Sequence, residues 1–402
     1  VFNKVFFSQT GNGTTALILS YMSFAIGYIA GPFGAIFFGH IGDRKGRKVT
    51  MYASLLMMGI STSIIGILPP AASAGVGVVI VLQLMRLAQC FGRGGTWGGG
   101  ILMAYENVPE NKRSFYAAIP QIGLPIGFGL SSILIAVPTL LLPEDIFFTW
   151  GWRIPFLAAI ILTLIVIRQK GEMMETEDYK KAQAKLEAEE AEGKKHKVGF
   201  IPMVKGYWKT LLLGCGTRWV DGTFYNIFIV WILSYCINWL GMPLIQTYII
   251  TIIACIFKIP FTLFGGWCAQ KLGNTRTFVI GALASAVLSI PTLKVIELSK
   301  GNLAITIIGI VLGWSIAYNL IWAVISSLWS SYFETEVRYS GISFVYHVPS
   351  FLVAGMVPTI CTLLINYGKG DTIYVGIYST VVALISAACA LALKARHDRG
   401  EK

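Results

Sequence analysis

The chain has 402 residues, of which 55% are hydrophobic and only 13% are charged. Soluble domains average roughly 45–50% apolar and about 25% charged residues, so this composition excludes an ordinary soluble protein. The formal net charge of +12 could suggest a nucleic-acid partner. The cations instead follow an alternating loop pattern, described below, and we expect no nucleic-acid binding.

Long segments without Asp, Glu, Lys or Arg recur along the whole chain. Each is longer than the roughly 20 apolar residues that cross a bilayer core as a helix. A membrane β-barrel would instead show segments of about ten residues with alternating polarity. The sequence therefore predicts an all-α, multi-pass membrane protein with eleven spans, near residues 14–40, 49–69, 76–105, 114–142, 152–168, 209–236, 245–270, 276–297, 302–330, 340–366 and 372–394.

Lys and Arg are unevenly divided between the loops on the two sides of these spans. One set of loops holds nineteen, whereas the other holds only Lys4, Lys300 and Lys369. The positive-inside rule places the first set in the cytoplasm. We therefore expect an inner (plasma) membrane protein with a cytoplasmic C-terminus and with residue 1 outside.

One long polar segment interrupts the apolar pattern. Seven Lys and eight acidic residues lie between Lys170 and Lys197. Good helix formers with charges of both signs indicate a solvated linker. We therefore divide the chain into an N-terminal bundle (1–168), a cytoplasmic linker (169–208) and a C-terminal bundle with a short tail (209–402).

The two bundles show an internal repeat. Gly46 and Gly273 hold equivalent positions 227 residues apart, and Arg113 and Arg338 hold equivalent positions 225 apart. Shifting the span 209–236 back by about this offset places its partner almost wholly before residue 1. We therefore expect two pseudo-symmetric six-helix bundles, with the first helix missing from this chain.

The segment GHIGDRKGRK (39–48) has features beyond topology. Gly39, Gly42 and Gly46 permit a tight turn and close helix approach. Asp43 could accept hydrogen bonds from a facing helix N-terminus. The neighbouring cations satisfy the positive-inside pattern, but topology alone would not explain the glycines and the acid.

This segment resembles the cytoplasmic signature loop of the major facilitator superfamily. Further stretches resemble its metabolite:proton symporter branch, which includes shikimate, α-ketoglutarate, citrate and proline/betaine permeases; they are 86–89, 94–99, 150–156 and 338–341. Thr96 stands where that branch usually has an acid, Arg93 where an apolar residue is usual, and Gln270 where the second half usually has Asp. The resemblance implies the superfamily fold and a cytoplasmic gate that includes Gly39, Gly42, Asp43, Arg44, Gly46, Arg47 and Arg338.

Charged residues lie inside several spans. At a helix centre they cost roughly 2.5–3.5 kcal/mol on insertion scales, so they usually face a cavity or a partner. Arg86, Gln89 and Arg93 recur at i, i+3 and i+7, which puts them on one helix face. Lys258, in another span, either snorkels to the interface or pairs with Asp221.

Asp221 is the clearest acid at mid-depth. A carboxyl that alternates between water and a nearby guanidinium can load and release a proton. We therefore predict a proton-coupling group of Asp221, Arg218, Arg86 and His347. The alternatives are a static Arg218–Asp221 ion pair, a structural anchor at Arg86 and an interhelical hydrogen bond at His347.

Polar and aromatic residues near span centres predict the lining of a substrate pocket. Arg93 is the preferred ligand because a guanidinium binds a carboxylate through two hydrogen bonds. The predicted substrate-binding residues are Arg93, Tyr21, Tyr28, Gln89, Gln121, Asn226, Asn319, Trp322 and Tyr346. Aromatic residues nearer span ends, namely Trp150, Trp152, Trp208 and Trp239, are expected as interface anchors.

We expect a secondary active transporter that couples symport of a small organic anion, a mono- or dicarboxylate, to protons by alternating access. The alternatives are symport of a zwitterion such as proline or betaine, exchange, and a membrane sensor that binds without transport. The chain lacks GxxxxGK[ST], HExxH and GxSxG, and its glycine-rich run 92–100 lies within a span, where helix packing explains it better. The seven cysteines show no paired spacing. We therefore expect no enzymatic activity, no cofactor and no metal, and a monomer in the bilayer.

Overall fold

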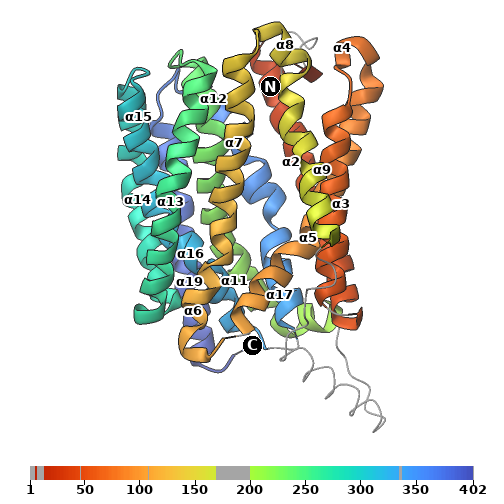
Figure 1. Ribbon diagram of the computed structural model, residues 1–402. Helices are drawn as coiled ribbons and strands as arrows, with labels where there is room; N and C mark the ends of the chain where they lie inside the picture. Colours follow the sequence, from red (N-terminus) through yellow and green to blue (C-terminus); the bar gives the residue numbers. More distant parts are fainter. Residues whose placement is uncertain are drawn as a thin grey trace.

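The computed structural model describes residues 5–6, 13–45, 47–106, 108–168, 200–334 and 337–401. For residues 13–14, 42–47, 72, 97–100, 102–103, 106 and 200–202 it describes at most the backbone. The described chain is helical and contains no strand. Eleven of its helical stretches are long and apolar enough to cross a membrane, which confirms the predicted number. They run side by side from one end of the molecule to the other (Figure 1).

The first half is built from long helices joined by short turns. They are α2 (Gly13–Lys45), α3 (Arg47–Ile67), α4 (Ala71–Ala74), α5 (Val76–Glu106), α6 (Arg113–Ala118), α7 (Gly123–Leu141), α8 (Glu144–Thr149) and α9 (Ile154–Arg168), with 3₁₀ turns η1 (Glu110–Lys112), η2 (Pro120–Ile122) and η3 (Gly151–Arg153). The turn η2 interrupts the span formed by α6 and α7, because Pro120 has no N–H to continue the helix.

In the second half, three spans contain a π-helical segment. The elements are α11 (Phe200–Asn226), η5 (Ile227–Trp231), α12 (Ile232–Asn238), α13 (Leu244–Leu272), α14 (Asn274–Leu298), α15 (Leu303–Ile310), η6 (Val311–Ala317), α16 (Asn319–Tyr332), α17 (Arg338–His347), η7 (Phe351–Gly355), α18 (Val357–Tyr367) and α19 (Ile373–Asp398). The π segments are η5, η6 and η7. Such segments occur often at functional sites.

The outside of the bundle is apolar, as a lipid environment requires. Leu141 is 75% exposed and Val287 is 73% exposed. Polar side chains lie inside instead, and Thr217, Ser326 and Asn319 have no exposed surface. Helices satisfy their own backbone groups, so only side chains need partners within the bilayer.

The glycine-rich run of α5 packs against α2 and α3, as its position within a span predicted. A Cβ atom added to Gly94 would meet the backbone of Gly34 and Ala35, well inside van der Waals contact. One added to Gly34 would meet the carbonyl of Phe91. Small residues let the two helix backbones approach closely. Close packing of this kind promotes helix association in the bilayer, where the hydrophobic effect does not drive helices together.

Three of the four tryptophans predicted as interface anchors are exposed at span ends. Trp150, Trp208 and Trp239 are 66%, 55% and 43% exposed. The prediction is wrong for Trp152, which has no exposed surface. Its ring meets Phe156 edge-on and lies under the guanidinium of Arg153, so this aromatic belongs to the core of the first half.

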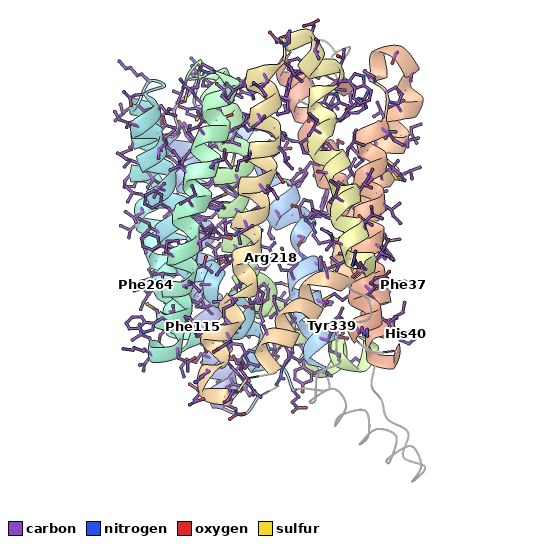
Figure 2. The ribbon with its side chains drawn as sticks, viewed as in Figure 1. Phe37, His40, Phe115, Arg218, Phe264 and Tyr339 are labelled. Atoms are coloured by element: carbon purple, nitrogen blue, oxygen red, sulfur yellow. The ribbon has the colours of Figure 1, made fainter. Side chains whose placement is uncertain are left out.

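The two halves are joined by hydrogen bonds at the end of the molecule where the C-terminus lies. Figure 2 places Phe115 and Tyr339 toward this end and Arg218 closer to mid-height. The side chain of Gln270 in α13 donates to the carbonyl of Asn111 and accepts from the N–H of Phe115. Ser326 in α16 donates to the carbonyl of Ala117, at 3.3 Å.

Most of the predicted cytoplasmic linker, residues 169–199, lies outside the described residues. Residues 200–208 belong to α11, which continues into the next span after a non-helical backbone conformation at Tyr207. The helix therefore begins before the predicted end of the linker.

Candidate functional site

A cavity of about 540 Å³ lies between the two halves. This volume falls in the range typical of small-molecule sites. Helices α2, α3, α5 and α7 contribute to its wall from the first half, and α11, α16 and α17 from the second. Its lining residues are Tyr28, Leu55, Met58, Arg93, Thr96, Ile101, Pro120, Gln121, Gly123, Leu124, Arg218, Asp221, Tyr225, Asn226, Trp322, Tyr346 and Ala354.

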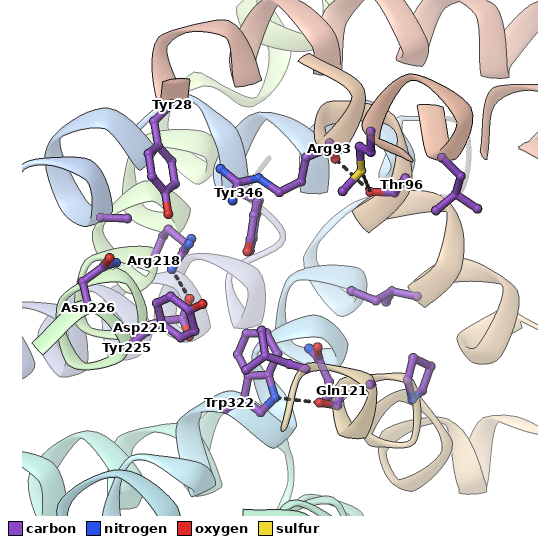
Figure 3. A pocket seen from close by; sticks show the side chains of 17 residues that line it. Tyr28, Arg93, Thr96, Gln121, Arg218, Asp221, Tyr225, Asn226, Trp322 and Tyr346 are labelled. Carbon is purple, nitrogen blue, oxygen red and sulfur yellow. Dashed lines mark hydrogen bonds and ion pairs between the residues drawn. The ribbon is translucent and has the colours of Figure 1, made fainter. Parts of the chain in front are cut away.

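Arg93 projects from α5 toward Tyr28 (Figure 3). Its guanidinium carbon lies 4.5 Å from the centre of the Tyr28 ring. One Nη atom lies 3.6 Å from the sulfur of Cys90, and Nε has no hydrogen-bond partner. Arg93 also has a side-chain hydrogen bond with Tyr28, but it forms no ion pair within the described chain, so no carboxylate of the described residues offsets its charge.

Arg218 and Asp221 form a buried ion pair one helical turn apart on α11. Asp221 is only 1% exposed, and its second carboxylate oxygen accepts a hydrogen bond from the hydroxyl of Tyr318. The Arg218 guanidinium also lies 4.2 Å from the centre of the Tyr346 ring. Both carboxylate oxygens of Asp221 therefore have a donor, one from Arg218 and one from Tyr318.

Polar groups from both halves meet on another part of the cavity wall. The indole N–H of Trp322 donates to the backbone carbonyl of Gln121 at 3.1 Å (Figure 3). Asn226 donates its amide to the carbonyl of Gly222, which leaves its side-chain oxygen without a partner. Because α11 and α16 belong to one half and η2 to the other, both halves contribute to this wall.

Most of the predicted substrate and coupling residues meet at this cavity. Those in its lining are Arg93, Tyr28, Gln121, Asn226, Trp322, Tyr346, Arg218 and Asp221. Tyr225, which lies seven residues after Arg218 and four after Asp221, also lines the cavity. Periodicity was thus the signal that could have added it to the site.

Three predicted substrate residues lie elsewhere. Tyr21 donates to Ser234 at 2.6 Å, across the two halves and outside the central cavity. Gln89 donates to Thr62 at 2.6 Å and lines a smaller cavity of the first half. Asn319 is buried in the second half beside Lys258.

Two predicted coupling residues lie near the cavity without lining it. Arg86 borders the smaller cavity with Gln89, and its guanidinium carbon lies 5.8 Å from the centre of the Phe24 ring. His347 is 1% exposed and packs against Gly31, and neither ring nitrogen has a hydrogen-bond partner among the described residues. The predicted interhelical hydrogen bond of His347 is therefore not formed in this structure.

Lys258 follows neither of its two predicted arrangements. It is fully buried, so its ammonium does not snorkel to the interface. It donates to the side-chain oxygen of Asn319 at 2.9 Å instead of pairing with Asp221. The sequence placed Lys258 on the right span but gave no sign that Asn319, 61 residues later, would meet it.

The predicted gate is described only in part. Gly39 packs against Tyr339 and Ser340 of α17. The Arg338 guanidinium lies 5.6 Å from the centre of the Tyr105 ring of α5, and its Nε donates to the carbonyl of Phe333. Gly46 lies outside the described residues, as do the side chains of Asp43, Arg44 and Arg47, and at most the backbone of Gly42 is described.

The described chain offers no group of three or more His, Cys, Asp or Glu that could hold a metal ion. Its seven cysteines are all free. The charged groups of the cavity wall are two guanidiniums and one carboxylate, which leaves a formal surplus of one positive charge. This arrangement suits the reversible binding of a small polar molecule.

Comparison with known proteins gives relatives along the whole chain. The family model of the Major Facilitator Superfamily matches residues 6–358. The inner membrane metabolite transport protein YhjE of Escherichia coli (strain K12) is 34% identical over 405 residues, covering 99% of this chain and 89% of that protein. The shikimate transporter of the same organism is 31% identical, covering 98% and 88%. The proline/betaine transporter of Salmonella typhimurium (strain LT2) is 27% identical, covering 98% and 78%.

Solved structures share the fold at low sequence identity. The proton:xylose symporter XylE bound to 6-bromo-6-deoxy-D-glucose superposes with a TM-score of 0.76 at 16% identity, covering 97% of this chain and 88% of that chain. The inward open conformation of the xylose transporter XylE from E. coli gives a TM-score of 0.66 at 16% identity, covering 98% and 89%.

Proposed function

Because the chain belongs to the Major Facilitator Superfamily and is a multi-pass membrane transporter of metabolites, not an enzyme, we propose that it couples the symport of a small organic anion to protons. The substrate class in this proposal is a mono- or dicarboxylate. Relatives named for shikimate transport and for proline or betaine transport support a substrate that carries a carboxylate.

The observation that carries the anion proposal is the position of Arg93. Its guanidinium lines the cavity, rests on the ring of Tyr28 and has no ion-pair partner within the described chain. Arg218 is already engaged by Asp221. A carboxylate entering the cavity would therefore be drawn first to Arg93, where it can accept two parallel hydrogen bonds.

Replacing Arg93 tests this proposal. Hydrogen bonds to charged groups contribute about 1.5–3 kcal/mol, so Arg93→Ala should raise the half-saturating concentration for uptake at least about tenfold. Arg93→Lys keeps the charge but loses the planar fork, and we expect an intermediate loss. Arg276→Ala, in α14 outside the cavity, is the matched control. Uptake that tolerates Arg93→Ala, or competition by cations alone, would contradict the anion proposal.

Asp221 is the proposed proton carrier. It is the one acid in the cavity lining, and Arg218 and Tyr318 hold its carboxylate. If the substrate draws Arg218 away, the carboxylate loses one of two donors and gains a proton. When the halves move and the substrate leaves, Arg218 returns and the proton is released.

Asp221→Asn tests the proton step in membrane vesicles. The amide cannot carry a proton, so accumulation driven by a pH gradient should be lost while substrate exchange at equal concentrations persists. Asp145→Asn, on the exposed helix α8, is the control and should retain both activities. Undiminished pH-driven accumulation in Asp221→Asn would contradict this role of Asp221 and favour coupling at His347.

A zwitterion such as proline or betaine is the second candidate. The aromatic rings of Tyr28, Tyr225, Trp322 and Tyr346 line the same cavity, and aromatic faces attract quaternary ammonium groups. Competition of uptake by shikimate, α-ketoglutarate and glycine betaine separates the two. Strong competition by betaine and none by the anions would favour the zwitterion. Binding without accumulation would instead favour a sensor, and accumulation only by exchange would favour an antiporter.

The proposed arrangement in the cell follows from the distribution of Lys and Arg. The C-terminus and residues 169–208 lie in the cytoplasm, and residues 1–168 and 209–402 form the two halves that move about the cavity. In this proposal the monomer is the working unit. The segment 39–47 and Arg338 form its cytoplasmic gate.

A further inference from the structure

Four buried side-chain atoms in the lining of the central cavity have no hydrogen-bond partner among the described residues. Three are donors and one is an acceptor: Nε of Arg93, Nε of Arg218, Nε2 of Gln121 and Oδ1 of Asn226. A buried polar group without a partner costs free energy, and a few such groups in a ligand cavity fix the orientation of the ligand. The donors and the acceptor of this lining therefore describe the ligand that the cavity fits.

The unpartnered atom of Asn226 is its side-chain oxygen, an acceptor. The side-chain nitrogen donates to the carbonyl oxygen of Gly222 at 2.8 Å, so exchanging the two atoms would place one acceptor against another. The backbone at this bond is tightly packed, because a Cβ atom added to Gly222 would clash with the carbonyl oxygen of Val353. Asn226 has no exposed surface. Its oxygen therefore needs an O–H or N–H group from the ligand.

The unpartnered atom of Gln121 is its side-chain nitrogen, a donor. Gln121 is 3% exposed and lies in the turn η2. Its backbone is held from the other half, since the indole N–H of Trp322 donates to its carbonyl oxygen at 3.1 Å. Figure 3 shows Arg93, Asn226 and Gln121 on different sides of the cavity. A ligand held at Arg93 therefore meets an acceptor on one side and a donor on another.

The charge of the lining matches a ligand with one carboxylate. Arg93 and Arg218 contribute two guanidiniums and Asp221 one carboxylate, a formal surplus of one positive charge. The hydroxyl of Thr96 is already engaged, since it donates to the backbone carbonyl of Arg93 at 3.1 Å. A second carboxylate on the ligand would exceed this surplus. It would also bring only further acceptors, which the oxygen of Asn226 cannot satisfy.

We propose that Asn226 and Gln121 determine specificity in this cavity and select a hydroxylated monocarboxylate. Its carboxylate binds Arg93, one hydroxyl donates to the side-chain oxygen of Asn226, and a hydroxyl oxygen accepts from the side-chain nitrogen of Gln121. A hydroxyl suits both amides because it donates and accepts. A carboxylate only accepts, and a quaternary ammonium has no N–H to donate. The inference rests on the proposed function, in which Arg93 binds the carboxylate of the substrate.

Binding of matched acids to the intact protein in detergent tests this selection without requiring transport. Isothermal titration compares shikimate with cyclohexenecarboxylate, and gluconate with hexanoate. The members of each pair share a carbon skeleton and a carboxylate and differ in their hydroxyls. One neutral hydrogen bond changes an affinity about two- to tenfold, so with two such bonds the hydroxylated member of at least one pair should bind about tenfold more tightly or better.

Two variants assign the preference to the two amides. Asn226→Leu removes the acceptor and Gln121→Leu removes the donor, and neither changes the charge of the cavity. Each should reduce the preference for the hydroxylated acid about three- to tenfold, while the affinity for the unhydroxylated acid does not fall. A merely structural role would lower both affinities together. Gln121→Leu also guards against poor folding of Asn226→Leu, because the Gln121 side-chain nitrogen has no described bond to lose.

Ser285→Ala is the matched control. Its hydroxyl is equally buried and has no described partner, but it lies on α14 outside the cavity. This variant should leave both affinities and their ratio unchanged.

Equal binding of the two members of every pair by the wild type, or a preference that survives both variants, would overturn the inference and leave the anion proposal standing. Methyl shikimate, the uncharged ester, separates the opposite case. If it binds as tightly as shikimate and the variants still weaken it, the hydroxyl selection holds and the anion proposal fails. Binding of neither member of either pair would contradict both.

Discussion

The hydroxyl of Tyr339 donates a hydrogen bond to the carbonyl oxygen of Gly95, at 2.9 Å, between residues 244 positions apart. It joins α17 of the second half to the glycine-rich run of α5 in the first. The side chain of Gln270 adds two further hydrogen bonds between the halves, to Asn111 and from Phe115. A neutral hydrogen bond of this kind contributes only about 1 kcal/mol.

Tyr339→Phe should therefore shift the protein toward the inward open form. Loss of about 0.5–1.5 kcal/mol corresponds to a population change of roughly two- to tenfold. Ala117 is fully buried, and its carbonyl accepts a hydrogen bond from Ser326 of the other half. In a cysteine-free background, a cysteine at position 117 should react faster with a cytoplasmic thiol reagent in the variant.

The control for this experiment is Tyr332→Phe. Its hydroxyl shares a hydrogen bond of 2.7 Å with Thr275 within the second half, so its loss leaves the contact between halves intact. Equal labelling rates in the wild type and in Tyr339→Phe would show that the Tyr339 hydrogen bond does not limit opening.

Topology gives a second prediction. Single cysteines at positions 185 and 369 should react with an impermeant reagent from opposite sides of the membrane, with position 369 reachable from outside. The reason is the excess of Lys and Arg in the loops assigned to the cytoplasm. The reverse pattern would invert the orientation proposed for the whole chain.

A third prediction concerns the contact of α5 with α2. Gly94→Val places a side chain against the backbone of Gly34 and Ala35, and such overpacking typically costs about 1–3 kcal/mol. We expect a lower unfolding temperature of the purified protein in detergent. Gly77→Val on the same helix is the control, since no atom lies within 4 Å of a Cβ added there. Equal losses in both variants would point to helix propensity and not to packing.

A fourth prediction concerns Asp371, in the turn between α18 and α19. Lys294 donates to its carboxylate at 2.7 Å, as does the N–H of Ile373, and both lower the pKa of Asp371 below its ordinary value. The stability gained is present above the ordinary aspartate pKa of about 3.9 and is lost as the pH falls through the lower, folded-state value. The carboxylate side chain is 44% exposed, so the gain is at most about 1 kcal/mol.

Asp371→Asn should lower the unfolding temperature near pH 7, and the difference from the wild type should shrink on acidification below about pH 3.9. Asp398→Asn provides the comparison, because its ion pair with Lys394 lies within the exposed end of one helix. A deficit in Asp371→Asn that is independent of pH would show that the turn, and not the charge, is responsible.

The spans were predictable because a helix in lipid satisfies its own backbone hydrogen bonds and must expose apolar side chains. A segment of about 20 residues without charged side chains is therefore enough to identify a span. The face carrying Arg218, Asp221 and Tyr225 was predictable for a related reason, since residues spaced by three, four and seven share one side of a helix. All three line the cavity.

Contacts between helices that are far apart in the chain could not be predicted from the sequence. Spacing shows that Arg86, Gln89 and Arg93 share a face, but not that only Arg93 reaches the central cavity. Asn319 and Lys258 were each recognised as polar groups within spans, yet their pairing depends on how α13 packs against α16. Trp152 was misplaced because its position near a span end said nothing of its packing against Phe156 and Arg153.

The three π-helical segments of the described chain all lie in the second half, and we expect them to make that half easier to bend than the first. Segment η5 follows Asn226, η6 precedes Tyr318 and η7 contains Ala354, so all three adjoin the cavity wall or its buried support, and all belong to the second half. A π turn is wider and holds its backbone less tightly than an α turn. We therefore expect the second half to absorb strain by bending at these points, while the glycine-packed helices of the first half move as stiff rods. Amide hydrogen exchange in the second half should accordingly be fastest around residues 227–231, 311–317 and 351–355.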